Sequence, residues 1–308
     1  MLLRSLLCRA QWKSSDQMHA ASFIYTLSGR TPDLINFVNI RDTTDPMNMQ
    51  EGNNDLSNTY THNAELTYNY NNKEKQASYS ASLTYNYIQN ALSKGYHYDS
   101  STGIRIWKPY NVNGNWNLQL TSQYDRPIDR QKKLMFRSYT TLAYQTSIDI
   151  INEQRSQVNT FTTHQLFRLN WKIGEHTLGL KLDGNFRNSR SPRTDFEKLH
   201  AFYFSNGMTA LLKLPWKMEL STDFSAFTRT RYNDPSMNGT EWVWNARLTR
   251  PLLKGRLLCV IDGYDLLAQR SNITRVIDAQ GRTETYTNSL PRYVLFHFIY
   301  RFNKLPKH

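Results

Sequence analysis

Apolar and polar residues alternate one for one through many segments of this chain. In the clearest segment, residues 77–87, Ala, Tyr and Leu occupy every second position, and Ser, Thr and Asn occupy the positions between them. Successive side chains of a β-strand point to opposite sides, whereas a helix of this sequence would mix the two kinds. The pattern therefore predicts a strand with one apolar face and one polar face.

The same alternation recurs to the end of the chain, which predicts an all-β, antiparallel fold. Further segments of this kind lie at residues 65–70, 116–124, 167–172, 178–187, 218–226, 242–249 and 293–302. Many of the expected strands exceed the usual length of strands in soluble sheets, and a tilted strand needs about 9–11 residues to cross a bilayer. Length therefore favours a transmembrane β-barrel, here with about 12 strands that would form part of a larger barrel.

The composition fits such a barrel. The chain has 19 Tyr, 14 Phe and 7 Trp among 308 residues, yet only 39% of its residues are hydrophobic. No stretch approaches the roughly 20 apolar residues of a spanning helix, whereas a barrel strand exposes only every second residue to lipid. The net charge of +13 is spread along the chain without a nucleic-acid-binding signature, so we expect no nucleic-acid partner.

Short and long connections alternate between the expected strands. The short ones are residues 72–76, 126–132, 172–176, 214–217 and 252–255, and the long ones are 28–60, 91–102, 148–160, 188–200, 230–240 and 270–290. Bacterial barrels have short periplasmic turns and longer outer loops. Because loops on a rigid scaffold commonly hold recognition residues, we expect an unidentified solute to bind at the long loops.

The two registers of the strands predict two environments. The apolar register is expected to meet outer-membrane lipid, with aromatic rings near strand ends forming girdles. It carries Tyr70, Leu83, Tyr87, Trp116, Tyr124, Trp171, Trp242, Phe298 and Tyr300. The polar register carries the basic residues Arg137, Arg168, Lys181, Arg187, Arg229 and Arg247 into the lumen. Such a lumen suits a polar or anionic solute, and equally suits hydration and pairing with Asp183, Glu219 and Asp223.

No catalytic or metal-binding motif stands out. The eight histidines form no HExxH or His-x-His pair, and no G-x-S-x-G nucleophile elbow is present. We therefore expect a non-catalytic protein without a cofactor. Residues 1–17 are set apart as the remains of an upstream strand or a non-native start, because Arg4 and Arg9 interrupt their apolar run. Residues 18–308 are expected to form the barrel domain.

Residues 24–32 (IYTLSGRTP), 45–53 (DPMNMQEGN) and 59–63 (TYTHN) form one group of motifs. Residues 245–249 (NARLT), 263–267 (GYDLL) and 290–302 (LPRYVLFHFIYRF) form a second group near the C-terminus. In this order the motifs resemble the mid-barrel and closing strands of TonB-dependent receptors and related Bacteroidetes outer-membrane barrel proteins. The resemblance covers the chain from about residue 20 to the end.

This resemblance implies the C-terminal part of a barrel that takes up a nutrient. In the family, the barrel-assembly machinery reads a terminal aromatic strand, which implies the role of assembly signal for Phe302. Family members also have a plug domain, a TonB-contact segment and a barrel of about 22 strands. This chain shows neither the plug nor that segment, so we do not expect TonB-coupled transport by it alone. The alternatives are a soluble or secreted β-sandwich adhesin or carbohydrate-binding module, and an outer-membrane barrel enzyme.

Overall fold

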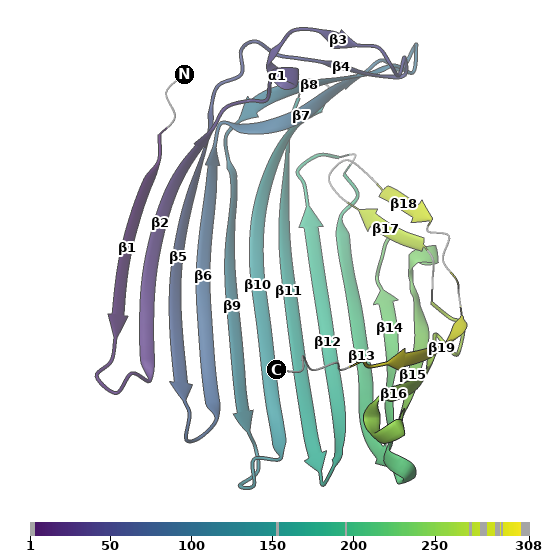
Figure 1. The fold of residues 1–308 in the computed structure, drawn as a ribbon. Coiled ribbons are helices and arrows are strands. Elements are labelled where there is room, and N and C mark those ends of the chain that lie inside the picture. The colour runs from purple at the N-terminus through teal and green to yellow at the C-terminus, as the bar shows by residue number, and fades with distance from the viewer. Residues whose placement is uncertain are drawn as a thin grey trace, which may run out of the picture.

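The structure is a computed structural model that describes residues 4–151, 154–194, 196–270, 273–277, 282–286, 290 and 292–302. Thirteen strands lie side by side in one curved antiparallel sheet (Figure 1). They are β1 (Leu6–Lys13), β2 (His19–Arg30), β5 (Thr59–Asn72), β6 (Ala77–Gln89), β9 (Asn115–Pro127), β10 (Leu134–Ile151), β11 (Gln154–Ile173), β12 (His176–Arg190), β13 (Leu199–Leu214), β14 (Met218–Thr230), β15 (Gly239–Leu252), β16 (Leu257–Tyr264) and β19 (Tyr293–Tyr300). The predicted all-β, antiparallel fold is confirmed.

The sheet begins earlier than the expected boundary at residue 18. Strand β1 pairs with β2 along its whole length, from Leu6 opposite Leu27 to Lys13 opposite Ala20. This pairing raises the expected strand number of about 12 to thirteen. Because every neighbouring pair is antiparallel, β1 and β19 run in the same direction. No ladder joins these two edge strands within the described residues, and the sheet is open.

Short turns join the strands at one end of the sheet, and the longer connections lie at the other (Figure 1). Two short turns contain the 3₁₀ helices η1 (Pro215–Lys217) and η3 (Leu253–Gly255), while η2 (Pro235–Met237) lies in a long connection. A long loop was expected over residues 148–160. Instead, β10 continues to Ile151 and β11 begins at Gln154, so only two residues separate the two strands. Cross-strand pairing persists there, from Ile148 opposite Gln157 to Ile151 opposite Gln154.

Two long connections fold into a cap over one end of the sheet (Figure 1). The cap contains α1 (Leu34–Phe37), β3 (Arg41–Asp42), β4 (Asn48–Glu51), β7 (Ala91–Tyr98) and β8 (Arg105–Val112). Strand β8 contains Pro109 and is separate from β9, because the chain turns at Gly114 with φ +108°. Farther along, β17 (Ile273–Ile277) and β18 (Arg282–Tyr286) form a two-stranded sheet. No helix in the described part of the chain is long and apolar enough to cross a membrane.

The cross-strand register sorts the side chains into an apolar face and a polar face. One row across β2, β5, β6, β9 and β10 reads Phe23, Leu66, Leu83, Leu120 and Leu142. The adjacent row reads Ser22, Thr67, Ser82, Thr121 and Thr141. Leu66 and Leu83 are 50% and 40% exposed. A β-sandwich would bury this apolar row against a second sheet, so the β-sandwich alternative is wrong.

Candidate functional site

All nine residues expected to meet lipid lie on the apolar face, as the pairing of their strands shows. Rings stand eight residues apart along four adjacent strands, in the pairs His62/Tyr70, Tyr79/Tyr87, Trp116/Tyr124 and Phe136/Tyr144. Eight residues span about 26 Å of strand, or about 20 Å across a bilayer at a tilt of about 40°. Tyr87 lies opposite both His62 and Trp116, so the rings form rows across the sheet. The spacing fits girdles at the two edges of an apolar band about 25 Å tall.

The six basic residues of the polar register fall into two groups. Four form ion pairs with acids of the same face: Arg137 with Asp125, Lys181 with Asp183, Arg229 with Glu241, and Arg247 with Asp262. Arg168 and Arg187 have no acidic partner among the described residues. Of the other acids that the sequence offered as partners, Glu219 pairs with Lys213 and Asp223 accepts a hydrogen bond from Asn245. The polar face therefore keeps an excess of positive charge.

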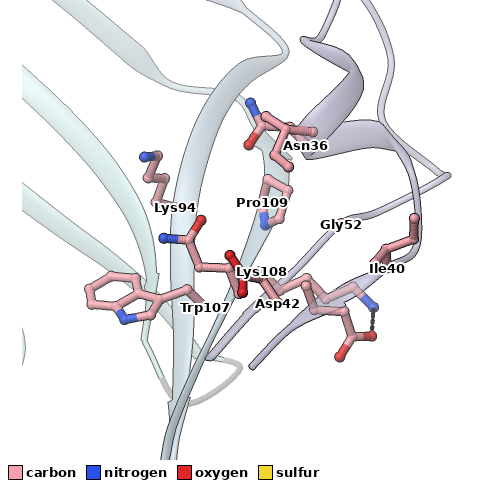
Figure 2. A pocket seen from close by; sticks show the side chains of 11 residues that line it. Asn36, Ile40, Asp42, Gly52, Lys94, Trp107, Lys108 and Pro109 are labelled. Atoms are coloured by element: carbon pink, nitrogen blue, oxygen red, sulfur yellow. Dashed lines mark ion pairs between the residues drawn. The ribbon is translucent and has the colours of Figure 1, made fainter. Parts of the chain in front are cut away.

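A pocket of about 320 Å³ opens inside the cap (Figure 2). Its walls come from the segment around α1, from β4, and from the hairpin of β7 and β8. It is lined by Ile35, Asn36, Ile40, Asp42, Gln50, Glu51, Gly52, Lys94, Trp107, Lys108 and Pro109. The pocket thus offers an indole ring and aliphatic walls beside amides and charges of both signs. This mixture suits a small solute with both polar and apolar parts.

Backbone pairing joins the two halves of the cap. Strand β4 runs parallel to β8, with Met49 opposite Ile106 and Gln50 opposite Trp107. The Asn53 side-chain amide donates a hydrogen bond of 2.9 Å to the Pro109 carbonyl. Gly52 leaves room for the close approach of this chain to the α1 segment, because a Cβ there would lie 1.8 Å from the Val38 carbonyl oxygen. These contacts fix the pocket walls to one another.

The acids of the cap pocket are already engaged. The Glu51 carboxylate lies 2.8 Å from Arg41 and 3.8 Å from Lys108. Figure 2 draws the ion pair of Glu51 with Lys108 as a dashed line. Hydrogen bonds from the Thr44 hydroxyl and backbone N–H lower the pKa of Asp42 below its usual value. Lys94 has no ion-pair partner among the described residues. Its ammonium group is therefore the free charge of the pocket.

The alternation of residues did not point to the cap pocket. Trp107 and Lys108 lie between the expected connections 91–102 and 126–132, in a segment expected to be a spanning strand. Lys94 lies in the expected long connection 91–102. The only available signal was the location of the long connections, which predicted the end of the barrel at which a solute would bind. Phe302, the expected assembly signal, is 86% exposed and its ring lies 4.6 Å from that of Tyr300.

Comparison with known proteins yields one assignment. Residues 11–300 match the model of the family described as "Outer membrane protein beta-barrel family". Neither a search of curated proteins nor a search of solved structures found a match. The match covers nearly the whole chain and agrees with the curved antiparallel sheet and its apolar face. The chain therefore belongs to the outer membrane protein beta-barrel family and is an integral protein of the outer membrane.

Proposed function

We propose that this chain is the barrel portion of a nutrient-uptake receptor of the TonB-dependent kind, which binds its solute in the cap pocket. The observation that carries the proposal is a walled pocket built from long connections on a rigid sheet. Its indole ring, its free Lys94 ammonium group and its amides can orient a polar solute, while Ile35 and Ile40 offer apolar contacts. The basic polar face beneath it would accept polar or anionic solutes.

We propose that binding occurs without chemical conversion. General acid–base catalysis needs a side chain that is available to move a proton to or from the bound solute, and the carboxyl groups in the pocket are those of Asp42 and Glu51. Glu51 lies between two cations, and the hydrogen bonds from Thr44 favour the ionised form of Asp42. Neither carboxylate is suited to that task. The residues that line the pocket also include no Ser, Thr or Cys nucleophile.

The proposal is tested by titrating the folded chain in detergent with a panel of di- and trisaccharides and di- and tripeptides. Trp107→Ala and Lys94→Ala should each weaken binding of the selected solute by about tenfold, since each removes one direct contact. Trp216→Ala is the matched control, because this exposed Trp lies in a turn at the opposite end of the sheet. Unchanged binding in both pocket variants would refute the pocket, and recovery of a chemically altered solute would refute the non-catalytic role.

A further inference from the structure

A second pocket, of about 290 Å³, lies on the polar face and is separate from the cap pocket. Side chains from β10, β11, β12 and β13 line it. They include Thr141, Thr162, His164, Asn185, Arg187 and Tyr203. Thr141, His164, Asn185 and Tyr203 follow one another in a single cross-strand row, while Arg187 stands in a row nearer the cap. Apart from Tyr232, which lies in the connection after β14, the lining residues belong to the sheet itself.

Arg187 supplies a free guanidinium group to this pocket. Its cross-strand neighbours are Thr162 and Ala201, neither of which carries a charge. It makes no ion pair with any described residue, unlike Arg229, which pairs with Glu241 on the neighbouring strand. A guanidinium group presents a planar fork of donors that matches a carboxylate or a phosphate. An unpaired fork facing a pocket is suited to an anionic ligand.

The acid nearest along β12 does not oppose such a ligand. Asp183 lies four residues from Arg187, or about 13 Å along the strand. Its carboxylate contacts Lys181 at 3.1 Å and His164 at 3.0 Å, and it accepts a hydrogen bond from Asn185 at 3.2 Å. The charge of Asp183 is therefore offset by its own neighbours. Arg187 keeps its positive charge uncompensated.

The remaining walls carry hydroxyl groups that are open to a ligand. The hydroxyls of Thr141, Thr162 and Tyr203 form no hydrogen bond with any described residue. Each can donate one hydrogen bond and accept others. A ligand with several hydroxyl groups can both donate hydrogen bonds to them and accept hydrogen bonds from them, whereas an ion such as sulfate can only accept.

We propose that this polar-face pocket binds a small hydroxylated anion, a sugar acid or a sugar phosphate, whose anionic group pairs with Arg187. The hydroxyls of the ligand meet the Thr and Tyr hydroxyls of the four strands. This assignment goes beyond binding in the cap and does not depend on it. A cap pocket that bound nothing would leave the polar-face pocket in place.

Calorimetric titration of the full folded chain in detergent tests the proposal with glucuronate, glucose 6-phosphate and glucose. We expect one or both anions to bind and neutral glucose to bind at least tenfold more weakly, with the stronger anion showing whether a carboxylate or a phosphate is preferred. Arg187→Ala should weaken anion binding by about tenfold to a hundredfold. Arg168→Ala is the matched control, because it removes another unpaired Arg of the same face, opposite Lys181 and about 20 Å along the strand.

Four results would overturn the assignment. The first is binding of neither anion by the folded chain, and the second is glucose binding as tight as that of the anions. The third is an equal loss in the Arg187 and Arg168 variants, which would indicate a diffuse positive field instead of a site. The fourth is loss of anion binding on Trp107→Ala with Arg187→Ala unaffected, which would move the anion to the cap. Circular dichroism confirms that each variant retains its strands.

Discussion

The Asp262 carboxylate on β16 accepts two hydrogen bonds from Arg247 on β15, at 2.5 Å from Nε and 3.1 Å from Nη2. His297 on β19 approaches the same carboxylate, with Nε2 at 3.0 Å from Oδ2. One buried acid thus contacts basic side chains from both neighbouring strands. Asp262 and Arg247 differ in exposure, since the Asp262 side chain is 3% exposed and that of Arg247 is 55% exposed. This contact connects the last three strands of the sheet.

This difference in exposure predicts that replacing Arg247 and replacing Asp262 lower the free energy of unfolding by unequal amounts. Arg247→Ala leaves a buried carboxylate without its main partner, so it should lower the free energy of unfolding by about 3 kcal/mol. Asp262→Asn leaves a guanidinium group that can turn to water, and should cost about 1 kcal/mol. Urea unfolding of the chain refolded into lipid vesicles measures both. Equal costs for the two variants would mean that water reaches the Asp262 carboxylate on the polar face.

The orientation of the two faces predicts opposite effects at adjacent positions. Leu83→Arg places a charge in the middle of the apolar face and should cost about 2–4 kcal/mol of folding free energy in a bilayer. Ser82→Arg should be tolerated, because Ser82 faces Glu65 on the next strand, to which it donates a hydrogen bond of 3.1 Å. The same unfolding measurement compares them. Similar costs for the two variants would show that the lipid does not cover the apolar face.

The strands and their faces could be predicted because each depends on a local pattern, the alternation of apolar and polar residues along consecutive positions. Alternation over residues 77–87 marks a strand that the structure extends to β6, Ala77–Gln89. The short turns follow from the same pattern, since each lies where alternation stops. Strand β1 was expected only as one of two interpretations of residues 1–17, the remains of an upstream strand, because Arg4 and Arg9 interrupt its apolar run. All eight of its residues are exposed, so its position in the sheet rests on backbone pairing with β2.

The cap could not be predicted because its contacts join residues far apart in the sequence. Gln50 lies opposite Trp107 in a parallel pair, and no local pattern in either segment encodes that meeting. Likewise, the polar register showed that Arg187 and Arg229 share a face, but not that only Arg229 meets an acid. That difference depends on the cross-strand register, which brings Glu241 close to Arg229 and leaves Thr162 and Ala201 beside Arg187.

Gly52→Ala should disrupt the cap and leave the barrel intact. The new methyl group would lie 1.8 Å from the Val38 carbonyl oxygen and 2.6 Å from its carbon, so one backbone segment must move. We expect faster protease cleavage between residues 31 and 58 and loss of solute binding in the cap pocket, with an unchanged unfolding midpoint for the sheet. Gly184→Ala on β12 is the control, because its methyl group would meet only the Phe204 ring, at 3.3 Å, away from the cap. Cleavage at the wild-type rate in the Gly52 variant would contradict the close approach.

Phe302→Ala should reduce the amount of chain assembled in the outer membrane by several-fold, if its terminal ring is read through pairing with a strand edge of the assembly machinery. Phe296→Ala removes another exposed ring, from β19, which ends two residues before Phe302, and serves as the control. Quantitative blotting of outer-membrane fractions compares the two. An equal reduction in both variants would show that Phe302 acts only as one more ring in lipid.

The tip of the β7–β8 hairpin should resist mild acid. The side chain and backbone N–H of Ser101, with the Thr102 hydroxyl, donate hydrogen bonds to Asp99 and lower its pKa to about 2. Because the folded pKa is depressed, the carboxylate stabilises the tip above the ordinary pKa of 3.8, and this contribution is lost as the pH falls toward about 2. Carbon NMR of Asp-labelled chain should show the low midpoint, and Ser101→Ala should raise it. A midpoint near 4 in the wild type would mean that the tip is not folded this way.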